Sequence, residues 1–148
     1  MYVSLFLLFM LGICLYTDLK RRIIPNIVTL TTFLAGIGVN GYHLLQTDGM
    51  NGLILLLVSL IIGVIICEKL LVRKKYWAYG DAKLFLATAV WFPPFVGLFA
   101  ILGLYIFLHF GYALIYRLMK RWNLTLLPAK FPGSILITAA VVISLVTL

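Results

Sequence analysis

Apolar residues in this chain form long runs, and short polar or charged stretches interrupt them. Runs of this length with few charges are typical of membrane-spanning helices. The strands of a membrane β-barrel would instead alternate apolar and polar residues over about ten positions, and no such alternation is visible. The pattern predicts six helices, at residues 1–17, 26–45, 53–71, 81–92, 95–116 and 131–148.

Proline and polar residues set the limits of these helices. Pro25 and Asn26 open the second helix, since proline is tolerated in a first helical turn and asparagine is a good N-terminal cap. Residues 46–52 predict a polar loop between the second and third helices. The fourth helix, at residues 81–92, is shorter than the roughly 20 residues that a full span requires. It is therefore buried inside the bundle or begins earlier than the pattern suggests.

Composition narrows the fold class further. The 148 residues are 64% hydrophobic and 11% charged, with a mean hydropathy of +1.16. A soluble domain would carry about a quarter charged residues, so a soluble fold is excluded. We expect an all-α integral membrane protein with a single domain, a bundle of six transmembrane helices. Cys14 and Cys67 fall within predicted spans and are interpreted as apolar core residues, not as a disulfide or a metal site.

The net charge of +8 has an explanation in membrane topology. Twelve basic residues outnumber four acidic ones, and in the six-helix layout all twelve fall on one side. Basic loops face the cytoplasm in membrane proteins, so we expect both termini outside and a multi-pass protein of the cytoplasmic membrane. We therefore expect the positively charged residues to contact the lipid bilayer, and we do not expect the protein to bind nucleic acid. The sequence does not indicate an oligomeric state.

Two of the four acidic residues, Asp18 and Asp81, lie where an apolar run meets a basic loop, on the predicted cytoplasmic side. A carboxylate at this depth is costly unless it has a partner or a role. Two such groups held close together could share a proton and activate water, as in aspartyl peptidases. Alternatively, each carboxylate caps a helix or pairs with nearby basic side chains such as Arg21 and Arg22. Spacing alone does not decide between these readings.

Two motifs resemble those of a known family. Residues 17–26 read TDLKRRIIPN, which resembles the first catalytic segment of type IV prepilin peptidases. Residues 78–84 read AYGDAKL, which resembles the GxGD segment of the same family, with Ala78 in place of its first glycine. The resemblance implies that Asp18 and Asp81 are the catalytic pair. It also implies a short, peptidase-only form, like those of tight-adherence pilus systems and archaeal preflagellin peptidases.

The resemblance further implies a substrate and the residues around the site. The substrate would be a pilin-like precursor with a basic leader followed by an apolar helix, cleaved at the cytoplasmic membrane boundary. Pro25, Asn26, Gly80 and Lys83 would bind substrate or support the site, and residues 128–133 would border it. This chemistry requires no metal, nucleotide or organic cofactor. The alternative is a non-enzymatic membrane protein, a small transporter subunit or a pilus-assembly scaffold.

One further motif has a structural interpretation. Residues 36–41 read GIGVNG and fit a dinucleotide-binding pattern literally. They lie inside an apolar run without a preceding strand, so we interpret the glycines as small residues that allow close helix packing.

Overall fold

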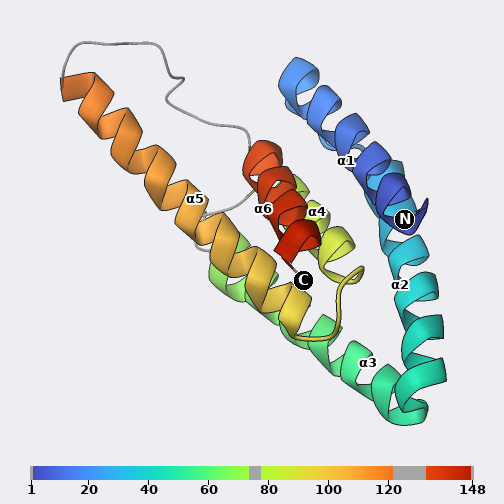
Figure 1. Ribbon diagram of the computed structural model, residues 1–148. Helices are drawn as coiled ribbons and strands as arrows, with labels where there is room; N and C mark the ends of the chain where they lie inside the picture. The colour runs from blue at the N-terminus through green and yellow to red at the C-terminus, as the bar shows by residue number, and fades with distance from the viewer. Residues whose placement is uncertain (1, 74–77, 122–132, 148) are drawn as a thin grey trace.

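The computed structural model describes residues 2–73, 78–121 and 133–147, and this part of the chain is all-helical (Figure 1). This confirms the all-α prediction. The described residues form six α-helices, namely α1 (Tyr2–Arg21), α2 (Asn26–Asp48), α3 (Met50–Ile65), α4 (Tyr79–Ala89), α5 (Val96–Arg121) and α6 (Gly133–Thr147), and the π-helix η1 (Ile66–Val72) continues α3.

The short helix α4 lies at the centre of the molecule. It packs against α2, α3, η1, α5 and α6, and in Figure 1 it lies with α6 between α5 on one side and α1 and α2 on the other. Six of its eleven residues are buried. The prediction allowed for burial or an earlier start, and both occur, since α4 begins at Tyr79 instead of residue 81.

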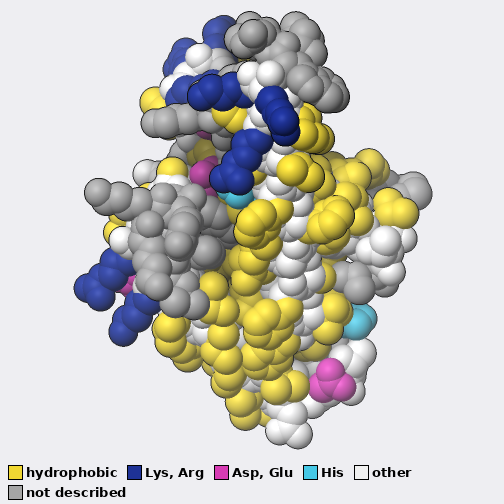
Figure 2. Space-filling view, turned by 90° about the vertical axis from the view of Figure 1, so that its left-hand side faces the viewer, with side chains coloured by type: hydrophobic (Ala, Val, Ile, Leu, Met, Phe, Trp, Pro, Cys, Tyr) yellow, Lys and Arg dark blue, Asp and Glu magenta, His cyan; other side chains and the backbone are white. Residues whose placement is uncertain are grey.

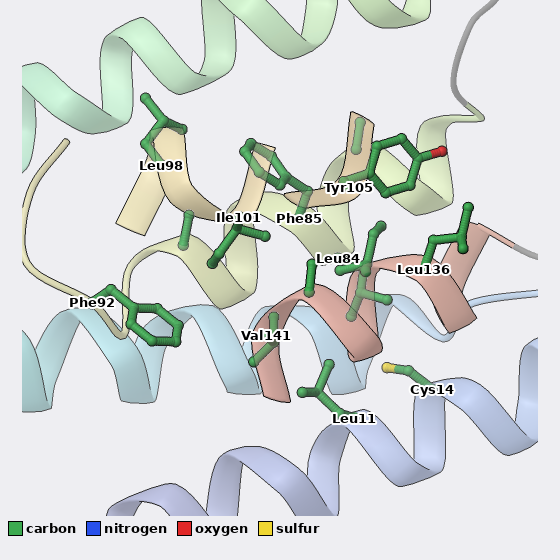
Figure 3. Packing of buried hydrophobic residues seen from close by; sticks show 14 of the residues in the cluster. Leu11, Cys14, Leu84, Phe85, Phe92, Leu98, Ile101, Tyr105, Leu136 and Val141 are labelled. Atoms are coloured by element: carbon green, nitrogen blue, oxygen red, sulfur yellow. The ribbon is translucent and has the colours of Figure 1, made fainter. Parts of the chain in front are cut away.

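The core is formed where α1, α4, α5 and α6 meet. Figure 3 shows Leu11, Phe85, Ile101 and Val141 in this cluster, one from each of these four helices. Each is at most 1% exposed. Cys14 joins this cluster as a free, buried thiol, as the sequence predicted. Because side chains of four helices interlock here, the core fixes where the start of α4 and the start of α6 lie relative to α1.

The turn between α2 and α3 differs from the prediction. Instead of a loop at residues 46–52, α2 continues to Asp48 and α3 begins at Met50. Gly49 alone turns the chain, with φ of 61°, a conformation that glycine adopts without steric cost. The polar residues of this segment are therefore helical, and the predicted loop is wrong.

The surface of the molecule is strongly apolar. Within the described residues, Asn26–Asp48, Met50–Lys69 and Val96–Arg121 are long and apolar enough to cross a membrane, and Gly133–Thr147 is a shorter apolar helix. Figure 2 shows hydrophobic side chains covering most of one face, with Lys and Arg gathered mainly at its upper end. Phe107 is 74% and Val146 is 82% exposed. Lipid can cover such a surface, whereas in water it would favour aggregation.

The carboxyl end of α4 is fastened to α2 by polar contacts. Asn40 Nδ2 donates to the backbone carbonyls of Val90, at 3.0 Å, and Phe92, at 2.7 Å. Trp91 Nε1 donates to the Thr32 carbonyl at 3.0 Å. Carbonyls at a helix end have no partner within the helix, so Asn40 satisfies groups that would otherwise be unpaired. The helix α4 itself ends at Ala89, before the predicted boundary at residue 92.

Candidate active site

Asp18 lies in the last turn of α1 and is 8% exposed. The last helical turn ends with a hydrogen bond in which the Arg22 backbone N–H donates to the Asp18 carbonyl at 2.9 Å. Arg22 has a φ of 55°, an uncommon value for a residue other than glycine, and this conformation ends the helical path. The Asp18 side chain lines a cavity at this end of α1.

Asp81 lies in the first turn of α4, three residues after the N-cap residue Ala78. This is the position from which an acidic side chain reaches back to the cap residue in a capping box. The position of Asp81 is therefore compatible with the helix-capping alternative as well as with a place in the site. Ala78 has φ −76° and ψ 155°. Alanine adopts these angles without strain, so its replacement of the first motif glycine imposes no backbone cost.

Asp18 and Asp81 line the same cavity and interact electrostatically. The cavity has a volume of about 400 Å³ and is lined by Asp18, Arg22, Ile23, Ile24, Asn26, Ala78, Gly80, Asp81, Lys83 and Gly133. Among the residues that the structure describes, no lysine or arginine nitrogen forms an ion pair with either carboxylate. The ion-pair alternative for Asp18, with Arg21 and Arg22, is thus not realised here.

Most of the other predicted site residues gather around this cavity. Gly80 packs against Ile24, since a Cβ at Gly80 would lie 3.4 Å from the Ile24 Cδ1 atom. Lys83 Nζ donates to Asn26 Oδ1 at 3.0 Å and links the starts of α2 and α4. These contacts bring the two sequence motifs together, although they are more than fifty residues apart.

Two details of the predicted second-helix start require correction. Asn26 is not the cap of α2: Pro25 occupies the N-cap position, and the Asn26 side chain turns instead to Lys83. Proline has no side-chain acceptor, so α2 begins without a side-chain cap. Pro25 does not line the cavity; its carbonyl accepts from the Thr29 backbone N–H at 3.2 Å and starts the helix.

The start of α6 supplies a third side of the site. Ser134 Oγ donates a short hydrogen bond to Asp18 Oδ2, and Gly133 lies directly against the Asp81 carboxylate. Sequence reasoning placed residues 128–133 beside the site by resemblance, and of these only Gly133 is among the described residues. It missed Ser134. The available signal was a small polar residue opening the last apolar run on the predicted cytoplasmic side.

Comparison with protein-family models identifies the class. Residues 5–118 match the type IV leader peptidase family, so the chain belongs to that family. The match confirms the resemblance drawn from the two motifs, and membership of the family implies a peptidase. Together with the long apolar helices, it indicates a membrane protein. Comparisons with curated proteins and with solved structures gave no significant match.

Proposed function

We propose that this protein is a membrane-embedded aspartyl endopeptidase that removes the leader from pilin-like precursors at the cytoplasmic membrane boundary. The observation that carries the proposal is the shared cavity: carboxylates from two separate sequence motifs, Asp18 and Asp81, line one space of about 400 Å³. That volume accommodates several waters and an extended piece of peptide backbone, which a water-dependent cleavage requires.

The carboxylate pair would act as a general acid and a general base. One carboxylate takes a proton from a water molecule while the water oxygen attacks the scissile carbonyl carbon. The protonated partner donates its proton to the carbonyl oxygen, which gives a tetrahedral diol. Collapse of the diol breaks the C–N bond, with one proton passing to the leaving nitrogen. Because two neighbouring carboxyls titrate as a unit, neither Asp18 nor Asp81 is assigned a fixed role.

A second cavity supports a substrate with an apolar segment. It has a volume of about 320 Å³, lies between α2 and α4, and is lined by Asn26, Thr29, Leu30, Phe33, Lys83 and Leu86. Asn26 and Lys83 belong to both cavities, so the apolar space begins where the polar one ends. A precursor whose polar leader is followed by an apolar helix matches this change of environment, with the scissile bond at the junction.

Leader removal from a co-expressed candidate precursor tests the proposal. Intact mass of the precursor is compared for wild type, Asp18→Asn, Asp81→Asn and the matched control Asp48→Asn, since Asp48 is exposed at the opposite end of α2. We expect wild type and Asp48→Asn to release the leader, and the two dyad variants to leave the precursor intact because the water then lacks its acid–base pair.

Other outcomes would reject the proposal in distinguishable ways. Cleavage by Asp18→Asn or Asp81→Asn at the wild-type rate would show that the pair is structural. An uncut precursor with wild type, across several pilin-like substrates, would favour the non-enzymatic transporter or scaffold.

A further inference from the structure

The first two residues of α6 each contact a different member of the carboxylate pair. Ser134 Oγ donates to Asp18 Oδ2, and Ser134 is fully buried, with 0% exposure. Most buried hydroxyls have a hydrogen-bond partner, and a carboxylate is a strong acceptor. The hydrogen bond therefore fixes the orientation of the Asp18 side chain, which α1 carries, from the start of α6.

Gly133 meets the other carboxylate. A Cβ atom built at this position would lie 2.5 Å from both Cγ and Oδ2 of Asp81, and 2.6 Å from Oδ1. Non-bonded carbon atoms do not approach one another this closely, so any side chain at residue 133 would displace the Asp81 carboxylate. The absence of a side chain at Gly133 thus allows Asp81 to keep its place in the cavity that Asp18 also lines.

We propose that Gly133 and Ser134 are positioning residues for the catalytic pair, holding Asp81 and Asp18 in the arrangement that activates water. The proposal rests on the proposed function, since it assigns roles relative to that pair. It goes beyond the family match, which covers residues 5–118 and ends before α6 begins. Residues that are adjacent in the chain reach both carboxylates, so one rigid helix start sets their relative position.

A second serine on the same helix provides a matched control. Ser144 is also 0% exposed, and its Oγ has no hydrogen-bond partner within the described residues. Ser134 and Ser144 therefore share residue type, helix and burial, and differ in the bond to Asp18. A general requirement for a buried serine in α6 would affect both positions equally, whereas a positioning role affects Ser134 alone.

The experiment measures kcat and KM for precursor cleavage, together with thermal unfolding in detergent, for Ser134→Ala, Ser134→Thr, Ser144→Ala and Gly133→Ala. We expect Ser134→Ala to lower kcat about 10- to 100-fold with KM within about twofold, since small displacements of a reacting group cost this much. Ser134→Thr, which keeps the hydroxyl, should recover much of the loss. Ser144→Ala should leave kcat unchanged, and Gly133→Ala should lower kcat by about 100-fold.

The variants also show what would overturn the proposal. If Ser134→Ala has the same kcat as Ser144→Ala while Asp18→Asn is inactive, the pair is catalytic but Ser134 does not position it. A loss in kcat that tracks a loss of folded protein, equal in both alanine variants, would assign the serines a packing role. If wild type cleaves no precursor, the proposed function fails, and this inference fails with it.

Discussion

The two ends of α4 both carry polar groups, and their surroundings differ. At the amino end, Asp81 faces a cavity of about 400 Å³ together with Asp18. At the carboxyl end, Val90 and Phe92 line a cavity of about 10 Å³, and their carbonyls accept hydrogen bonds from Asn40. That volume is barely enough for one water. Polar groups that are paired and dry stabilise the fold, whereas carboxylates that face an open space are available for chemistry.

The helix α4 can carry a stabilising end and a site-forming end because its buried middle residues fix its position in the core. Phe85, between the two ends, is 0% exposed and packs in the main cluster with Leu84 and Ile101. Phe85 and its neighbours hold α4 between the two ends, so the contacts made by Asn40 at one end contribute to stability and do not set the position of Asp81 at the other. Substitutions at the two ends should therefore separate activity from stability.

The largest effect is expected at the amino end. Asp81→Asn should lower the rate of leader removal by about 10²- to 10⁴-fold, the usual contribution of a positioned acid or base. The melting temperature should change little, because asparagine can still accept a hydrogen bond at the helix start. Precursor cleavage and thermal unfolding of the same detergent sample measure both quantities. An Asp81→Asn variant with the wild-type cleavage rate and a lower melting temperature would mean that Asp81 stabilises the fold and takes no part in catalysis.

Asn40→Leu should have the opposite profile. Leucine is similar in size but leaves the Val90 and Phe92 carbonyls without a donor, and each unpaired buried carbonyl costs about 1–3 kcal/mol. Thermal or denaturant unfolding in detergent should show this loss of stability. The cleavage rate per folded molecule should stay close to that of wild type. A stable Asn40→Leu protein with a much reduced rate would mean that the carboxyl end also takes part in function.

Two glycines of α2, Gly36 and Gly38, allow a matched test of how closely α2 packs against the carboxyl end of α4. A Cβ at Gly36 would lie 2.5 Å from Val90 Cγ2 and 2.7 Å from Trp91 Nε1, whereas nothing lies within 4 Å of a Cβ at Gly38. Gly36→Ala should therefore destabilise the protein by about 1–3 kcal/mol, the usual cost of overpacking. Gly38→Ala should be neutral or stabilise it by up to about 1 kcal/mol, because alanine favours the helix. Equal melting temperatures for the two variants would contradict this packing.

The contrast between the two ends was only partly predictable from the sequence. The apolar runs predicted the six α-helices of the described residues, and the two motifs singled out Asp18 and Asp81, which line one cavity. The role of Gly36 in close packing was also expected. The contacts of Asn40 and Ser134 could not be predicted, because they join residues that are 50 and 116 positions away in the chain. Periodicity describes which residues share a face of one helix, but the tertiary arrangement determines which distant group that face meets.

The single-residue turn at Gly49 was missed for a different reason. Polar residues such as Gln46 and Thr47 usually mark a loop, but here they continue α2 at an exposed helix end, where polar side chains are tolerated. Only the backbone angle at Gly49 shows where the chain reverses. The length of an apolar run therefore underestimates a helix whose ends extend beyond the apolar region.

The smallest effect is expected at Lys83, which lines the candidate site from α4. Lys83 is exposed, and its bond to Asn26 Oδ1 links α4 to α2. Lys83→Met removes one exposed hydrogen bond, so stability should change by about 0.5 kcal/mol or less. The cleavage rate should fall by less than about tenfold, in line with one hydrogen bond of about 0.5–1.5 kcal/mol.

Lys20→Met, at an exposed lysine that contacts Tyr16 and does not line the cavity, is the control for the lost charge. A fall well beyond tenfold for Lys83→Met alone would mean that the ammonium group acts on the carboxylate pair itself, beyond bracing the two helix starts.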